Sequence, residues 1–212
     1  MLVEKFESKH TLYSQLRVEE IVNRKHMTKS GWSDIEIQHV KGRKEEDSKS
    51  VINYLVAKKT QPCRHRNETS ILQLLKDVRC IFISRYYRSD HPEHADRILN
   101  EYCPYKSVDN YLHSHSKFVS LSTKMLFLFE IAIGIRFLRD NGIYHNDIKP
   151  ANILLKVMGS KLQSTFFMRI IDFGESQSPF QPIQLQRNSA DFKRGCTVPY
   201  APPEQVKFYR YN

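Results

Sequence analysis

Apolar and polar positions alternate along much of the first half of the chain, in the way that predicts β-strands. Residues 35–40 alternate, and residues 51–59 form a longer apolar run that ends in two lysines. A sparser pattern at 18–27 predicts an edge strand. The charged, glycine-containing stretch 41–50 predicts a long hairpin loop between its neighbours. Residues 80–87 are again strand-like, and the polar residues after them end that strand.

Helical periodicity predicts a helix at 66–76 and a longer one at 120–141. The dipeptide Asn141-Gly142 is a stop signal for the longer helix. We expect its continuous apolar face to lie in the core of the second half. That face consists of Leu121, Met125, Leu128, Ile131, Ile135 and Leu138.

Polar residues with recognisable chemistry follow this helix. The segment 144–155 has the pattern H-x-D-x-K-x-x-N before an apolar run. An aspartate such as Asp147 can orient an attacking hydroxyl and accept its proton. A lysine such as Lys149 can neutralise charge on a moving phosphoryl group, and an asparagine such as Asn152 can hold a metal ion that bridges phosphates. This spacing therefore indicates phosphoryl transfer.

A second motif, Asp172-Phe173-Gly174, ends a short apolar strand twenty residues after Asn152. Its aspartate is a second candidate metal ligand, beside a glycine that lets the backbone turn sharply. Alone, each motif is more often an ordinary loop or turn than a functional site. Together and in this order, they favour the functional interpretation.

With both motifs present, residues 18–212 resemble the eukaryotic protein kinase family. The resemblance implies an α+β, bilobal protein-kinase-like fold, with a small β-rich N-lobe and a helical C-lobe that lacks its last helices. The implied domains are a leader of unknown structure at 1–17, the N-lobe and hinge at 18–103, and a partial C-lobe at 104–212 that ends just after the activation segment.

The resemblance also implies an ATP site. Ala57 would lie against the purine and Lys59 would reach the α- and β-phosphates, because the two-residue period of a strand places them on one face. Glu68 of the first helix would pair with Lys59. The other implied ATP-binding residues are Ser30 and Gly31 of the glycine-rich loop, Ile35 and Leu154 on the two faces of adenine, and the backbone groups of Glu101 and Cys103 at its edge.

The implied catalytic residues are Asp147, Lys149, Asn152, Asp172 and Thr197. Asn152 and Asp172 would bind Mg²⁺, and Thr197 would form hydrogen bonds near Asp147 and Lys149. A stack of apolar residues would join the lobes. Its members would be His145, Phe173, Leu72 and Ile83.

Several positions depart from the family pattern. The glycine-rich loop keeps only its central glycine, Gly31, and only nine residues separate Lys59 from Glu68, fewer than in most kinases. Asn100 occupies the gatekeeper position, where an apolar residue or threonine is more usual. Asn146 replaces the arginine that normally clasps a phosphate on the activation loop, which predicts weak dependence on loop phosphorylation.

Two further features bear on the class of kinase. Lys149 belongs to the serine/threonine form of the catalytic loop. The segment 195–204 resembles the end of an activation segment, with Pro202 where alanine is usual. This variant, together with Asn146 and the Arg-Asn-Glu start of the first helix, gives a weak similarity to the monopolar spindle kinases.

Only eight residues follow Glu204, where the family has several more helices. The underside of helix 120–141 would then expose apolar surface. We expect either a fragment of a longer kinase, which we favour, or a natural truncation that needs a partner protein to complete the C-lobe.

Composition limits the remaining possibilities. The formal net charge of +10 is spread along the chain without a long basic run, which favours a solvated basic surface over a nucleic-acid partner. The four cysteines form no C-x-x-C pair, and residues 1–10 contain no apolar secretory segment, so we expect an intracellular protein of the cytoplasm or nucleus. The apolar run 125–138 is too short and too charged to span a membrane.

Two hypotheses on function follow. The first is transfer of the γ-phosphoryl group, dependent on ATP and Mg²⁺, to serine or threonine hydroxyls of a protein substrate. The alternative is a catalytically weak, kinase-like (pseudokinase) binding or regulatory module. The core catalytic positions favour the first hypothesis, whereas the depleted glycine-rich loop and the short Lys59–Glu68 separation favour the second.

Overall fold

The computed structural model describes residues 16–29, 33–44, 47–62, 66–76, 80–90, 95–115, 119–160, 163–180, 197–201 and 203. The chain divides into two compact units. The first comprises Met1–Cys63 with Arg85–Tyr102, and the second comprises Arg64–Ser84 with Cys103–Asn212. The contacts thus group residues 64–84 with the second unit, whereas the domain bounds expected from the sequence stay a prediction.

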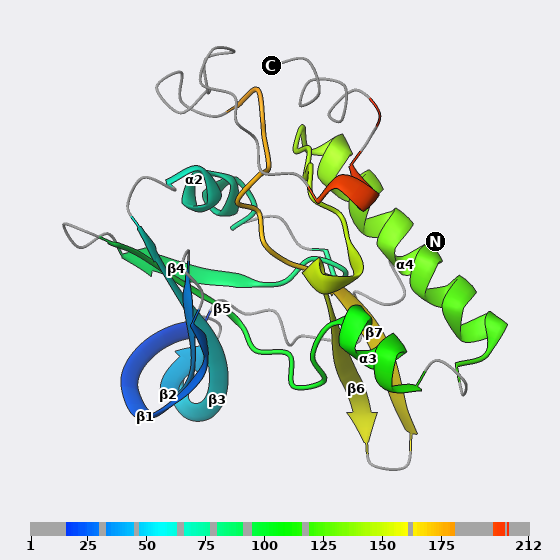
Figure 1. Cartoon of the computed structure of the whole chain (residues 1–212). Helices are drawn as coiled ribbons and strands as arrows, with labels where there is room; N and C mark the ends of the chain where they lie inside the picture. The colour runs from blue at the N-terminus through cyan, green and yellow to red at the C-terminus, as the bar shows by residue number, and fades with distance from the viewer. Residues whose placement is uncertain are drawn as a thin grey trace. The chain divides into compact units, whose positions relative to one another are not determined.

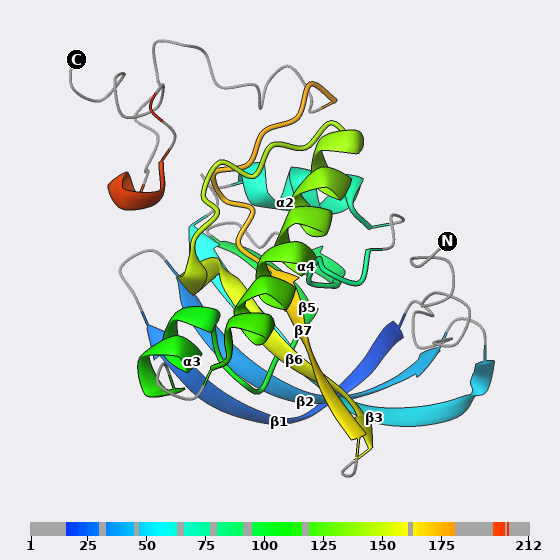
Figure 2. The ribbon, with the colours of Figure 1, turned by 90° about the vertical axis from the view of Figure 1, so that its right-hand side faces the viewer.

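The first unit contains a five-stranded antiparallel sheet in the order β1-β2-β3-β5-β4. Figures 1 and 2 show that β1, β2 and β3 curve strongly along their length. Register shifts along the β1–β2 pair accompany this bending, as irregularities in a ladder commonly do. The strands are β1 Leu16–Lys29, β2 Asp34–Lys44, β3 Asp47–Pro62, β4 Tyr86–Asp90 and β5 Ala95–Glu101.

The register of β2 and β3 gathers the sequence-predicted residues of this unit on one face. Ile35 lies directly opposite Lys59, and Ile37 lies opposite Ala57. Because side chains alternate between faces, Lys58 points the other way, where its Nζ atom lies 3.1 Å from Oε2 of Glu36. This second face, to which Lys58 points, also carries a small core of Val40, Val56 and Leu99.

Two expectations about this part of the chain were wrong. The predicted long loop at 41–50 is largely strand, because β2 continues to Lys44 and β3 already begins at Asp47. The ladder of an antiparallel pair is formed by backbone groups, which charged residues also supply, so the charge in this stretch did not mark a loop. The predicted strand at 80–87 is strand only from Tyr86, and the residues before it form turns around one parallel bridge, Ile83 to Ile170.

The second unit combines helices with a β-hairpin. The 3₁₀ turn η2 leads directly into β6, so the residues of the H-x-D-x-K-x-x-N pattern lie between the long helix and this hairpin. The elements are α2 Arg66–Leu74, α3 Val108–His115, α4 Leu121–Asp140, η2 Pro150–Asn152, β6 Ile153–Ser160, β7 Gln163–Ile170 and η5 Val198–Tyr200. The predicted α+β class is confirmed.

Helix α4 lies along the hairpin (Figure 2). Its first turn is capped by Ser120, whose Oγ atom accepts a hydrogen bond from the backbone N–H of Thr123 at 3.1 Å. A glycine permits the close approach to β7, since a Cβ atom at Gly134 would lie 2.8 Å from Cδ1 of Ile170. The buried core at this contact consists of Val108, Phe127, Ile153, Leu155 and Met168.

The core-facing side of α4 matches the predicted one only at Ile131 and Leu138. Phe127, Glu130, Gly134 and Leu138 are buried, whereas Leu121, Met125, Leu128 and Ile135 are exposed. The helix is apolar around most of its circumference, so periodicity alone did not identify the packed side. The predicted exposure of apolar surface on this helix is confirmed. Among the helices that the structure describes, none is long and apolar enough to cross a membrane.

Candidate active site

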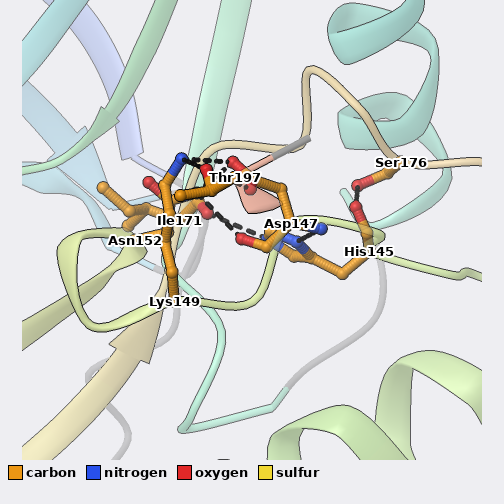
Figure 3. A network of polar contacts seen from close by, with 7 residues as sticks. All are labelled: His145, Asp147, Lys149, Asn152, Ile171, Ser176 and Thr197. Carbon is orange, nitrogen blue, oxygen red and sulfur yellow. Dashed lines mark hydrogen bonds and ion pairs between the residues drawn. The ribbon is translucent and has the colours of Figure 1, made fainter. Parts of the chain in front are cut away.

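Asp147 is the centre of a polar network in the second unit (Figure 3). Its Oδ2 atom lies 2.7 Å from Nζ of Lys149 and accepts a hydrogen bond from Nδ2 of Asn152 at 2.8 Å. Its Oδ1 atom accepts a hydrogen bond from Oγ1 of Thr197 at 3.1 Å. These contacts hold the carboxylate in one orientation while its side chain stays partly open to solvent.

Asn152 connects the two motifs. Its Nδ2 group donates to both the backbone oxygen and the side chain of Asp147, so its amide orientation is fixed with Oδ1 turned away from that carboxylate. Its backbone oxygen accepts from the N–H of Ile171 at 3.0 Å, one residue before Asp172. The side chain is buried. The structure thus ties the catalytic-loop asparagine to the strand end that carries the second motif.

Thr197 reaches this network from a distant part of the chain. Lys149 donates from Nζ to Oγ1 of Thr197 at 2.7 Å, and the threonine hydroxyl donates onward to Asp147. The backbone oxygen of Thr197 accepts from the N–H of Tyr200 in the turn η5. The three side chains form a closed triangle of contacts.

His145 is buried, and its two ring nitrogens have different partners. Nε2 lies 3.0 Å from the backbone oxygen of Ile171, which can only accept, so Nε2 carries the proton. Nδ1 then accepts from the N–H of Asp147 at 3.3 Å. The ring lies against Phe173, with centroids 5.0 Å apart. Burial lowers the pKa of His145, although the Ile171 hydrogen bond and the nearby Asp172 and Asp147 act in the opposite direction.

This lowered pKa predicts a pH dependence of stability. Below its ordinary value of 6.5 the unfolded chain binds a proton at His145 that the folded chain does not, so stability falls as pH drops through that window. We expect His145→Gln to lose less stability than the wild type between about pH 7.5 and 5.5. Urea denaturation at both pH values measures this. His113→Gln, at an exposed position of α3, is the control; equal losses in wild type and His145→Gln would contradict the prediction.

Asp172 follows the end of β7 by two residues and has a left-handed backbone at φ 65°. Its carboxylate and the amide oxygen of Asn152 are hard oxygen ligands, which Mg²⁺ prefers. Within the described ranges no group of three or more His, Cys, Asp or Glu side chains could hold a metal ion. Mg²⁺ is usually bound through one or two protein carboxylates together with substrate phosphates.

The remaining sequence-predicted residues divide between the two units. In the second unit Glu68 and Cys103 are buried, and Leu154 alternates with the core residues of β6 and is only half-buried. Burial raises the pKa of the Cys103 thiol to about 11, against the lowering effect of Arg169. In the first unit Ile35, Ala57 and Lys59 are half-buried on one face, whereas Glu101 is buried. Ser30 and Gly31 lie outside the described residues.

Pairing of Lys59 with Glu68 stays a prediction, because the two residues belong to different units. Glu101 is engaged within the first unit, where its N–H donates to the backbone oxygen of Arg85 at 2.8 Å. The four residues of the predicted apolar stack, namely Leu72, Ile83, His145 and Phe173, are all buried in the second unit.

Sequence reasoning missed two polar features of the second unit. The side-chain amides of Asn67 and Asn146 donate to backbone oxygens at the last residue of Asp172-Phe173-Gly174 and at the two residues after it. Glu130 is buried in α4, where it accepts from the N–H of Met168 at 2.9 Å, with Arg169 nearby and also buried. A glutamate in the middle of an apolar helix was the available signal for the second feature.

Comparisons with known proteins agree with this geometry. The family model described as the protein kinase domain matches residues 38–212. Serine/threonine-protein kinase ATG1b of Arabidopsis thaliana is 34% identical over 115 residues, which are 54% of this chain. Serine/threonine-protein kinase STE11 of Saccharomyces cerevisiae is 33% identical over 154 residues, or 70% of this chain.

Receptor-interacting serine/threonine-protein kinase 2 of Bos taurus is 32% identical over 114 residues, or 52% of this chain. The aligned regions cover only 15% of the ATG1b kinase and 20% of each of the other two relatives. The family model nevertheless matches well over half of this chain. The chain therefore belongs to the protein kinase family.

Proposed function

We propose that this chain transfers the γ-phosphoryl group of ATP, with Mg²⁺, to serine or threonine hydroxyls of a protein substrate. The observation that supports this most directly is the network around Asp147, in which one carboxylate contacts Lys149, Asn152 and Thr197. The three relatives are all named as serine/threonine kinases, which favours hydroxyl substrates of this class.

In this proposal Asp147 orients the substrate hydroxyl and accepts its proton as the oxygen attacks the γ-phosphorus. A bond forms between that oxygen and phosphorus, the bond to the β-γ bridging oxygen breaks, and ADP leaves with the electron pair. Lys149 offsets the negative charge on the moving phosphoryl group. The ammonium group already lies 2.7 Å from Asp147, so both act at the same point.

Other residues would bind the nucleotide and the metal ion. Mg²⁺, when bound, would neutralise phosphate charge, and Asn152 and Asp172 would hold it. We propose that Lys59 binds the α- and β-phosphates and that Glu68 orients Lys59. Adenine would be bound by Ile35, Ala57 and Leu154 and by the backbone groups of Glu101 and Cys103, with Ser30 and Gly31 at the phosphates.

Thermal unfolding with and without Mg²⁺–ATP tests the nucleotide site. Ligand at 100 times its dissociation constant adds about 2.7 kcal/mol of stability, which raises the melting temperature by about 5–10 °C for a chain of this size. We expect Asp172→Ala to lose most of this rise. Asp140→Ala, at the exposed end of α4, should keep it. A cooperative transition that Mg²⁺–ATP does not move would instead favour the pseudokinase-like binding module.

A further inference from the structure

Two asparagine side chains from distant segments hold the backbone from Gly174, the last residue of the second motif, to Ser176. Asn67, near the start of α2, donates from Nδ2 to the backbone oxygen of Gly174 at 2.9 Å and to that of Ser176 at 2.8 Å. Asn146, directly before Asp147, donates from Nδ2 to the backbone oxygen of Glu175 at 3.1 Å. Three consecutive carbonyl groups are therefore bound by two neutral amides. We call this arrangement the amide clamp.

Further contacts fix the same stretch against the catalytic loop. Ser176 is fully buried, and its Oγ atom donates to the backbone oxygen of His145 at 3.2 Å (Figure 3). Gln177 and Tyr144 exchange two backbone hydrogen bonds, of 2.8 and 2.9 Å. The amide clamp thus lies at the start of a short segment, residues 174–177, that is hydrogen-bonded to the loop that carries Asp147.

The clamp lies next to a residue whose backbone needs support. Asp172 has φ 65°, a left-handed conformation that is uncommon for residues other than glycine and that persists when surrounding contacts hold it. Upstream, the N–H of Ile171 donates to Asn152 and the oxygen of Ile171 accepts from His145. Downstream, the amide clamp begins two residues later. Asp172 is bracketed on both sides by hydrogen bonds.

We propose that Asn67 and Asn146 are positioning residues that keep Asp172 oriented for Mg²⁺ without any phosphate on the activation segment. This role rests on the proposed kinase function. A guanidinium at position 146 would form its strongest hydrogen bonds with an anion such as a phosphate, whereas the amide of Asn146 donates to a backbone carbonyl that is always present. Asn146 itself has φ 65°, which asparagine tolerates better than arginine does.

Two substitutions remove the donors while preserving local backbone preferences. Asn67→Asp keeps the side-chain shape and is favourable in the first turn of a helix, but it places a carboxylate against the oxygens of Gly174 and Ser176. Asn146→Gly keeps the left-handed backbone and removes only the amide. Asn110→Asp in the first turn of α3 is the matched control, since Asn110 is exposed and bonds only locally to Ser107.

Amide hydrogen exchange in the full chain tests the amide clamp. We expect Ser176 and Gln177 to exchange at least about tenfold faster in Asn67→Asp and Asn146→Gly, with no change in α4 and none in Asn110→Asp. ADP formation then tests the positioning role. The Mg²⁺ concentration for half-maximal rate should rise at least about fivefold in both variants, excess Mg²⁺ should restore much of the rate, and phosphatase treatment of the wild type should leave its rate unchanged.

Each contrary result identifies what fails. Slow exchange retained in both variants would overturn the amide clamp. Faster exchange with an unchanged Mg²⁺ requirement would overturn the positioning role, as would a wild-type rate that phosphatase abolishes. A wild-type chain that forms no ADP above the level of Asp147→Asn would overturn the proposed function, and the positioning role with it, while the exchange result would still decide whether the clamp exists.

Discussion

Replacing Asp147 by asparagine should lower the rate of phosphoryl transfer by about 10²–10⁴-fold, which corresponds to about 3–5 kcal/mol in the barrier. The amide cannot accept the hydroxyl proton, and its NH₂ group would be a poor neighbour for the ammonium of Lys149, which now lies 2.7 Å from Oδ2. The loss should fall on kcat, because Asp147 is not among the residues proposed to bind the nucleotide.

Steady-state release of ADP, with casein as a general protein acceptor, measures this effect. The KM for ATP should change by no more than about threefold, and Mg²⁺–ATP should still raise the melting temperature of the variant. Asp140→Asn is the matched control, at an exposed position that contacts Arg136 and Arg139. If Asp147→Asn kept more than about a third of the wild-type rate, Asp147 could not have the role proposed for it.

The residues of the candidate site could be predicted because their chemistry is concentrated in two short motifs. Asp147, Lys149 and Asn152 lie within six residues, so their side chains cannot be far apart in the fold. The apolar run after them predicted a buried strand, and its residues Ile153 and Leu155 lie in the core. Thr197 was reached only through the family resemblance, since nothing local in the sequence connects it with Lys149, to which it is hydrogen-bonded.

The amide clamp could not be predicted in the same way. Asn67 lies 107 residues before Gly174, and an asparagine amide can donate to any carbonyl that tertiary folding brings within reach. The substitution at position 146 was visible, but what it contacts was not. The sequence indicated that an arginine was absent, whereas the structure shows the hydrogen bond that the asparagine forms instead.

The packed side of α4 illustrates a second limit. Periodicity identifies a packed face only when the opposite side of a helix is polar. In α4, Leu128 and Phe129 are exposed next to the buried Phe127 and Glu130, so hydrophobicity favoured a face of which only Ile131 and Leu138 pack. Contacts with β7 determine which side of α4 packs. The N–H of Met168 donates to Glu130, and the side chain of Ile170 fits against α4 because Gly134 has no Cβ atom.

Glu130 should therefore be among the residues most sensitive to substitution. Glu130 is 4% exposed and the neighbouring Arg169 is 1% exposed. Burial raises the pKa of the Glu130 carboxyl, while the hydrogen bond from Met168 and the positive charge of Arg169 lower it. Removing the carboxylate leaves the N–H of Met168 without its acceptor, which typically costs about 1–3 kcal/mol, and the lost side-chain volume adds to that cost. We expect Glu130→Ala to lose about that much stability.

A graded pair of substitutions separates the charge from the hydrogen bond. Glu130→Gln keeps an oxygen that can accept from the N–H of Met168, so it should lose less stability than Glu130→Ala, and the difference measures the acceptor and the side-chain volume. Urea denaturation of both variants gives the free energies of unfolding. Asp140→Ala, an acid on the exposed end of the same helix, should change stability by less than about 1 kcal/mol. Domains are stable by only about 5–15 kcal/mol, so the loss expected for Glu130→Ala is a large fraction of the total. A Glu130→Ala variant as stable as Asp140→Ala would mean that the buried carboxylate contributes nothing to the packing of α4 on β7.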